Sequence, residues 1–408
     1  MLRQDGRTAG IIYFELLTVT WHMQEYLYKE ISKKWPLGRE NLIICASHTH
    51  TAPDSRNSSS EYSEEYTMDL FEKSLAAVQN AFDSMAPGEL YVGTTTESRF
   101  AFNRRYWMKD GSVLTNPGKL NPEIDCPEGE VDHTIPMLGI KQNGQFKVLL
   151  VNISNHGDST GGTGVSGDWM GVCRRQIETA MGNGVMCFPL ISPSGNINHV
   201  DVNDPEDQVS TVEAERLGKG YAETIIEATA ELKPVEKYTL KAANISVETE
   251  PRNVTEEEKA EAIAIIEQYS GIEAAPGGGD LISEDLVKRT PIALRFFAEA
   301  ILSIAEDTAM RTFNLVYLDL GPVGILSLPS EVFVETGVAI RNCQPEKMLM
   351  LATHSGTGAD HLKGGYIPNA WNYGRGGYET AHRSNPYEER TAEKLLDAAG
   401  KLLHNISG

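Results

Sequence analysis

Along the chain, short continuous apolar runs alternate with segments in which apolar residues recur at helical spacing. This pattern predicts strands and helices that follow one another. Apolar runs over 10–19 and 41–47 are typical of short buried strands, and the stretch between them, rich in Glu, Lys and Tyr, is predicted to be a helix. Apolar residues recur at helical spacing over 62–85, ahead of a short strand at 89–93. This order predicts a β-α-β unit at the start of an α/β protein.

Two predicted strands run directly into polar, glycine-rich loops. The strand over 147–154 is followed by Asn155 and His156, and a strand over 185–190 is followed by the polar loop 192–199. The pattern also predicts a helix over 172–181 and two strands, over 314–320 and 324–328. Because ligands commonly lie beyond strand ends, these loops are candidate sites.

Residues 251–312 have a different pattern, with a Glu/Ala-rich helix, a break at 275–280 and a second, apolar helix. This predicts a helical hairpin inserted into the sheet, either as a packing appendage or as a lid. We therefore expect an α/β (α+β mixed) fold, in which residues 1–408 form one domain with a large mixed-sheet body flanked by helices.

Composition and charge exclude several classes of partner. The net charge of −21 opposes binding to nucleic acid and to anionic lipid surfaces. No apolar run reaches the roughly 18 residues of a transmembrane segment. The five cysteines have no Cys-x-x-Cys spacing, which argues against a thiolate zinc site. The N-terminus does not have the pattern of a secretory signal, so we expect a cytoplasmic protein or an exported one whose leader is absent from this chain.

Three distant stretches carry the candidate chemistry. They are Ser-His-Thr-His-Thr-Ala-Pro at 47–53, Asn-His-Gly at 155–157, and Leu-Pro-Ser-Glu with a later Gly-Gly-Tyr pair within 328–378. On an extended backbone His48 and His50 share one face. Together the stretches supply imidazoles, a carboxylate and a phenol, which could hold one Zn²⁺ with a water beside it and so indicate a hydrolase.

The order and spacing of these stretches resemble the neutral, or non-lysosomal alkaline, ceramidase family of zinc amidases. The matching segments run from about residue 10 to the C-terminus and are ENLIICASHTHTAP, NRRY, VNISNHGDS with SGDW, SGNINH, LPSEVFVETG and GGYIPNAWNYGRGGYE. The resemblance implies a catalytic domain that cleaves an amide (N-acyl) bond by a metal-activated water. The implied substrate is an acylated small molecule, with ceramide-like lipids of sphingolipid metabolism as one candidate.

The resemblance also implies residue roles. The zinc ligands that it implies are His48, His156, Glu331 and Tyr366. His50 would protonate the leaving group, while Arg104 and Tyr378 would stabilise the oxyanion, with Arg105 left open as an alternative to Arg104. The residues expected to support the ligands or contact the substrate are Asp168, Asn198, His199, His354 and His361.

Two departures from the family pattern keep other functions open. Asn198 stands where the family has a serine near the reacting centre, and the resemblance ends without the family's C-terminal β-sandwich. The alternatives are therefore an ester hydrolase, or a non-hydrolytic zinc lyase or binding protein for a soluble small molecule such as a modified sugar. A further alternative is a protein without catalytic activity in which the metal only stabilises the fold.

Overall fold

The structure, a computed structural model, describes residues 1–53, 55, 61–272, 290–356 and 364–407. Its body holds two larger sheets. The five-stranded sheet has the order β11 (Met186–Ile191), β10 (Gln145–Ile153), β9 (Thr134–Gln142), β4 (Glu89–Thr96), β13 (Lys233–Pro234). The four-stranded sheet has the order β14 (Lys241–Thr249), β15 (Arg311–Asp319), β16 (Val323–Ser327), β18 (Met348–Ala352).

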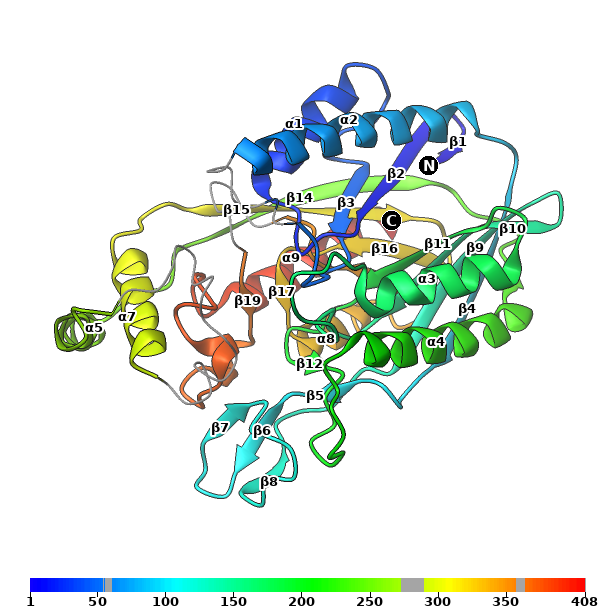
Figure 1. The fold of residues 1–408 in the computed structure, drawn as a ribbon. Coiled ribbons are helices and arrows are strands. Elements are labelled where there is room, and N and C mark those ends of the chain that lie inside the picture. The colour runs from blue at the N-terminus through cyan, green and yellow to red at the C-terminus, as the bar shows by residue number, and fades with distance from the viewer. Residues whose placement is uncertain (54, 56–60, 273–289, 357–363, 408) are drawn as a thin grey trace.

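The two sheets face one another, because alternate residues of their strands enter different cores. Leu150 and Val316 belong to a core shared by both sheets, whereas Leu149 and Leu315 point to the opposite faces. Helices α3 (Asp168–Met181) and α4 (Thr211–Ala228) lie side by side over the outer face of the five-stranded sheet (Figure 1). Helices α8 (Val334–Arg341) and α9 (Thr391–Ser407) pack on the outer face of the other sheet.

A third sheet has the order β1 (Leu2–Gln4), β2 (Arg7–Phe14), β3 (Leu42–Ala46), and helices α1 (Trp21–Ser32) and α2 (Glu61–Asp83) pack on it. Strands β2 and β3 are parallel, as a β-α-β unit requires. Parallel pairs also join β10 to β11 and β16 to β18, whereas the other pairs of the two larger sheets are antiparallel. The predicted mixed α/β class is therefore confirmed.

Smaller strand pairs surround the ends of the main strands. A three-stranded sheet has the order β7 (Val113–Thr115), β6 (Arg105–Met108), β8 (Ile124–Pro127). The two-stranded pairs are β12 (Ile197–Asn198) with β5 (Phe102–Asn103), and β17 (Glu331–Val332) with β19 (Tyr366–Ile367). Short 3-10 turns occur at η1 (Thr229–Glu231), η3 (Ala370–Asn372) and η4 (Tyr378–Thr380).

Two helices, α5 (Glu256–Gln268) and α7 (Pro291–Ala305), come between the neighbouring strands β14 and β15. They pack against one another at one end of the molecule, away from the sheets (Figure 1). Helix α5 begins at a capping box in which Thr255 and Glu258 bond each other's backbone N–H groups. Part of the predicted hairpin segment 251–312, including the break at 275–280, lies outside the described residues.

Three further observations refine the sequence predictions. The strand predicted over 10–19 ends at Phe14, where the chain bends toward the Thr20 cap of α1. The helix predicted over 172–181 begins earlier, at Asp168. Among the helices that the structure describes, none combines the length and apolarity needed to cross a membrane.

Candidate metal centre

Two loops at strand ends bring the predicted histidines together. His48 follows β3 and His156 follows β10, and the loops are joined by a parallel bridge between Thr49 and Gly157. The backbone N–H of His50 donates to the carbonyl of Gly157 at 3.0 Å. A Cβ atom at position 157 would lie 2.5 Å from the carbonyl oxygen of His48, so only glycine allows this approach.

Several backbone positions around this cluster are strained. Four of the nine non-glycine residues with left-handed φ angles in the described part of the chain lie in or beside its segments: His48 (62°), Asp168 (52°), Ser330 (52°) and His354 (55°). Such conformations cost on the order of 1–3 kcal/mol each for a side chain other than glycine and gather at functional sites. The fold holds these segments in conformations that their local sequence does not favour.

Nitrogen and oxygen atoms from three distant segments converge. The Nε2 atom of His48 lies 3.0 Å from Nε2 of His156 and 3.3 Å from Oε2 of Glu331. Nε2 of His156 lies 3.7 Å from the same oxygen. A tetrahedral zinc ion with ligands at 2.0–2.1 Å holds its ligand atoms about 3.3 Å apart, which these distances bracket.

The hydrogen bonds of the cluster also fit a cation. Nδ1 of His48 lies 2.8 Å from the carbonyl oxygen of Leu17, so Nδ1 carries the proton and donates it, while Nε2 presents a lone pair to the cluster. Nδ1 of His156 and Oε2 of Glu331 are buried and have no hydrogen-bond partner among the described residues. Nε2 of His156 faces the lone pair of His48 at 3.0 Å, a position that suits either an N–H of His156 or a metal ion held by both nitrogens.

His50 completes the group from the solvent side. Its Nε2 lies 3.3 Å from Nε2 of His48, and the ligand atoms of His48, His50 and His156 all lie within 4.8 Å of one another. His50 is exposed, whereas the other two histidines are buried. Crowding by protein atoms and the neighbouring His48 lower the pKa of His50 to about 4. His50 is therefore neutral at pH 7 and is placed to serve either as a third nitrogen ligand or as a proton carrier.

Tyr366 is brought to the site by a strand pair. In the parallel register of β17 and β19, Glu331 lies opposite Tyr366, although 35 positions separate them in the chain. Tyr366 is buried beneath the guanidinium of Arg104, which lies 5.0 Å from the ring centroid. Burial raises the pKa of Tyr366 well above its usual range, against the opposing effect of Arg104. Its role as the fourth ligand stays a prediction.

The structure distinguishes Arg104 from Arg105. Arg104 lies over Tyr366, whereas the guanidinium of Arg105 lies 5.6 Å from the ring centroid of Phe333 and pairs with Glu128; both arginines pair with Glu379. Tyr378 is exposed, and its ring centroid lies 5.8 Å from that of Tyr366. Arg104 and Tyr378 are thus the pair that faces the candidate centre.

The supporting residues divide into three kinds. Asp168 accepts hydrogen bonds from the backbone and hydroxyl of Thr160, both at 2.9 Å, and so holds the loop after His156. His354 stacks on His48 with ring centroids 3.9 Å apart. Asn198 donates to Asn116 at 3.2 Å and accepts from Val200 at 3.1 Å, which fixes the turn after β12. His361, with Asp360, lies outside the described residues.

Asp158 was missed at the sequence level. It pairs with His199, whose Nδ1 lies 3.2 Å from Oδ1 of Asp158 and whose Nε2 donates to the carbonyl of Gln208 at 2.6 Å. Burial alone would lower the pKa of His199, but the bonds to Asp158 and Gln208 outweigh it and raise the pKa above 6.5. The sequence signal that could have indicated a site role for Asp158 is its position two residues after His156.

This pair predicts a pH-dependent stability. A raised folded-state pKa means that His199 stabilises the fold below about pH 6.5, the pKa of an unfolded histidine, and that this contribution is lost as the pH rises through the folded-state pKa. The melting temperature of His199→Gln should therefore fall further below wild type at pH 5.5 than at pH 8.5. His404→Gln, at an exposed site in α9, is the control. An equal loss at both pH values would refute the assigned charge.

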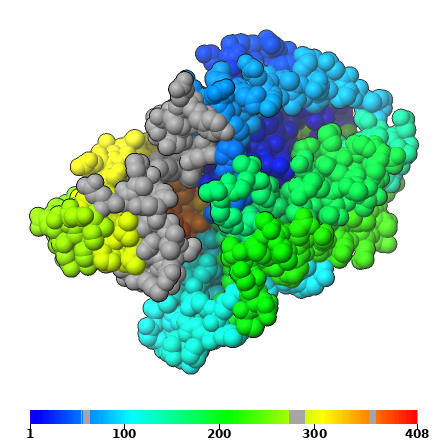
Figure 2. Space-filling view, viewed as in Figure 1, coloured from blue at the N-terminus to red at the C-terminus, as the bar shows by residue number. Residues whose placement is uncertain are grey.

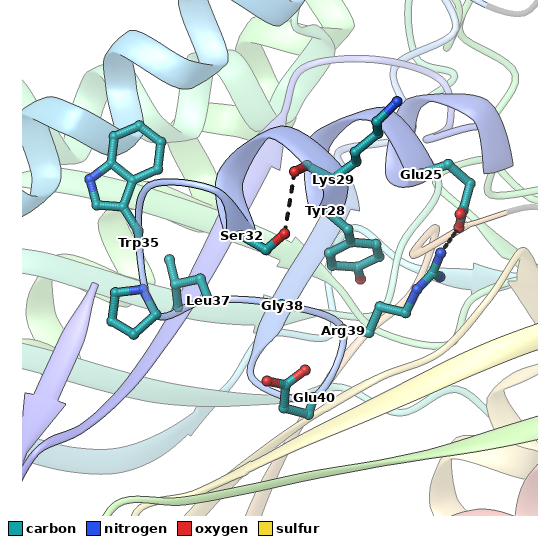
Figure 3. A pocket seen from close by; sticks show the side chains of 10 residues that line it. Glu25, Tyr28, Lys29, Ser32, Trp35, Leu37, Gly38, Arg39 and Glu40 are labelled. Carbon is teal, nitrogen blue, oxygen red and sulfur yellow. Dashed lines mark hydrogen bonds and ion pairs between the residues drawn. The ribbon is translucent and has the colours of Figure 1, made fainter.

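A surface recess of about 480 Å³ lies elsewhere, between α1 and the loop that follows it (Figure 3). Glu25 and Arg39 form an ion pair beside it, and the guanidinium of Arg39 lies 5.1 Å from the ring centroid of Tyr28. None of the predicted site residues that the structure describes lines this recess.

Figure 2 shows a separate hollow, in which orange-brown C-terminal residues lie between blue, green and cyan segments. Figure 1 has β17 and β19 in that part of the same view.

Comparison with known proteins identifies the fold. No protein-family model and no curated protein matches the sequence. The crystal structure of neutral ceramidase from Pseudomonas aeruginosa matches with a TM-score of 0.67 and 15% identity, over 96% of this chain and 66% of that chain. The chain has the neutral ceramidase fold. A structure titled as a ceramidase complexed with C2 matches equally well, with a TM-score of 0.67, 14% identity, and coverage of 96% of this chain and 67% of that chain.

This fold confirms the resemblance to the neutral ceramidase family that the sequence motifs indicated. The chain spans about two thirds of the length of the two ceramidase structures.

Proposed function

We propose that this protein is a zinc-dependent hydrolase that cleaves an amide (N-acyl) bond. The observation that carries the proposal is the convergence of Nε2 of His48, Nε2 of His156 and Oε2 of Glu331, with separations of 3.0, 3.3 and 3.7 Å. A closed structural zinc site has four protein ligands and no solvent access, whereas a hydrolytic site keeps a position open. The exposure of His50 at this cluster favours the second kind.

The residues around the cluster supply the remaining steps of an amide hydrolysis. Zinc, when bound, acts as a Lewis acid that lowers the pKa of water toward about 7 and polarises a carbonyl group. His50, neutral at pH 7, accepts a proton from the attacking water and passes it to the leaving nitrogen. The buried guanidinium of Arg104 and the phenol of Tyr378 donate hydrogen bonds to the oxygen on which negative charge develops.

Tyr378→Phe tests the oxyanion role with little change in structure. The substitution removes one donor from an exposed ring, so kcat is expected to fall about 10²-fold, the typical effect of losing one oxyanion donor. Zinc content should stay at the wild-type level, because the ring contacts Tyr366 by its edge and keeps that contact as phenylalanine. Steady-state kinetics with metal analysis measure both. Unchanged kcat would remove Tyr378 from the mechanism.

For the substrate, we propose an acylated small molecule, with an N-acyl lipid as the first candidate. The support is the fold, because the two structures compared above are ceramidases. The buried, polar walls formed by Arg104, Glu331 and Tyr366 suit a carbonyl group and its flanking amide rather than an alkyl chain.

The test is a substrate panel assayed with zinc-loaded and chelator-treated protein. The panel contains N-acyl sphingosines of short and long chain, N-acetylglucosamine, acyl 4-nitroanilides and 4-nitrophenyl esters. We expect turnover of amides by the zinc-loaded protein, and loss of that turnover after chelation with recovery on adding Zn²⁺. Turnover of esters alone would replace the amide assignment, and turnover of none of these compounds would overturn the proposed function.

A further inference from the structure

A buried carboxylate, Glu379, joins the two groups assigned to the oxyanion. Its side chain is fully buried in η4, directly after the exposed Tyr378. Oε1 lies 2.8 Å from Nε of Arg104, and Oε2 lies 2.7 Å from Nη1 of Arg105. Oε2 also accepts a hydrogen bond from the hydroxyl of Thr115 at 2.6 Å. The carboxylate of Glu379 therefore has three partners: Arg104, Arg105 and Thr115 of β7.

The contacts of Arg104 show what Glu379 contributes. The guanidinium is held at Nε by Glu379 and at Nη2 by the carbonyl of Gly195, to which it donates at 2.8 Å. The ion pair with Glu379 and the hydrogen bond to Gly195 restrain the guanidinium in its place above the ring of Tyr366. The carbonyl of Gly195 alone would restrain the position of the guanidinium, but it would not balance the positive charge of Arg104.

The same residue fixes Tyr378 through the backbone. The N–H of Tyr378 donates to the hydroxyl of Thr115 at 2.9 Å, and that hydroxyl donates onward to Glu379. Glu379 thus orders the turn on which Tyr378 stands and also orders Arg104 across from it. The two donors of the proposed oxyanion site share a single buried anchor.

Charge balance explains why the anchor is an anion. Arg104 and Arg105 are neighbours in sequence and both are buried, which is costly unless each is paired. Burial alone would raise the pKa of Glu379, but Arg104 and Arg105 hold it below its usual range. Without this carboxylate, the other anions that interact with Arg104 among the described residues include Asp158 and Glu331, and Glu331 is a candidate metal ligand.

We propose that Glu379 is a positioning residue, which keeps Arg104 away from the metal ligand Glu331 and holds Arg104 and Tyr378 as one oxyanion-binding pair. The part of this proposal that concerns turnover rests on the proposed function. The part that concerns the orientation of Arg104 does not.

Two matched variants test the proposal. Glu379→Gln removes the charge but keeps the shape, and Glu128→Gln does the same to the carboxylate that pairs with Arg105 and Arg375. Both variants leave Arg105 with one carboxylate, but Glu379→Gln also removes the ion pair of the buried Arg104 and should therefore lose more stability than Glu128→Gln, whose second partner Arg375 is partly exposed. Only Glu379→Gln should lower kcat, by about 10-fold to 100-fold, with KM within about twofold of wild type and zinc content unchanged. Equal losses of kcat in the two variants would overturn the proposal.

Crystal structures of the zinc-loaded variants give a readout that needs no substrate. In Glu379→Gln the guanidinium of Arg104 should turn toward Glu331 or Asp158, whereas in Glu128→Gln it should stay over Tyr366. An unmoved Arg104 in Glu379→Gln would overturn the proposal even if activity fell. If the wild type hydrolyses nothing in the panel, the proposed function fails while these structures still decide the role of Glu379.

Thr115→Val provides a second, milder test should Glu379→Gln not fold. It removes the hydroxyl that links Glu379 to the backbone of Tyr378 but keeps both arginine pairs. We expect a smaller fall in kcat, about 10-fold or less, with Arg104 in its wild-type place. Wild-type kcat in Thr115→Val would refute the link to Tyr378.

Discussion

Replacement of His156 by alanine is expected to abolish zinc binding and, with it, amide hydrolysis. Zinc bound by a full protein ligand set has a binding free energy on the order of 10 kcal/mol, so one ligand contributes a few kcal/mol, or about 10²-fold or more in affinity. His156 is buried, and its Nε2 lies 3.0 Å from that of His48, at the centre of the cluster. Elemental analysis of the purified variant, together with turnover at saturating substrate, measures both losses.

The control for this variant is His404→Ala, which removes an exposed histidine from α9 that bonds only the carbonyl of Gly400 among its described contacts. It should keep one zinc per chain and wild-type turnover. Circular dichroism should show that His156→Ala remains folded, because the cluster lies in loops at strand ends. Full zinc content in a folded His156→Ala protein would remove His156 from the ligand set.

Replacement of His50 by alanine is expected to give the second large effect, with the opposite result for the metal. Loss of a general acid–base group typically lowers the rate by about 10²–10⁴-fold. His50 is exposed, so its removal leaves little cavity, and His48, His156 and Glu331 remain to bind zinc. The variant should therefore keep its zinc and lose most of its kcat.

The comparison of metal content with turnover decides between the two roles that the geometry allows for His50. Its Nε2 is as close to Nε2 of His48 as is Oε2 of Glu331, at 3.3 Å in both cases. Loss of zinc from His50→Ala would make His50 a ligand, and Tyr366 would then not be needed in that role. Retained zinc with retained turnover would exclude both roles.

Much of the site could be predicted because its motifs follow strands. The apolar runs that form β3 and β10 end directly before the segments of His48 and His156, so the sequence indicates loops at strand ends for both. The two strands lie in different sheets, and the expectation that these histidines share one site came from the family resemblance. The strand predicted over 10–19 was too long, since an apolar run does not show where the chain bends. That bend brings the carbonyl of Leu17 to Nδ1 of His48.

Contacts between distant segments could not be predicted from local patterns. The pairing of β17 with β19, which sets Glu331 opposite Tyr366, depends on tertiary packing rather than on either two-residue strand. The choice between Arg104 and Arg105 likewise depends on which of the two neighbouring side chains lies over Tyr366. Glu379 gave no signal of its own, because a glutamate after a tyrosine in a loop is usually solvated.

The central claim, a single zinc ion held between three distant strand ends, is tested most directly by anomalous diffraction at the zinc edge from crystals grown with Zn²⁺. The account predicts one strong peak, about 2.0–2.1 Å from Nε2 of both His48 and His156 and within coordination distance of Glu331. A peak elsewhere in the molecule, or no peak at this cluster in zinc-saturated crystals, would contradict it.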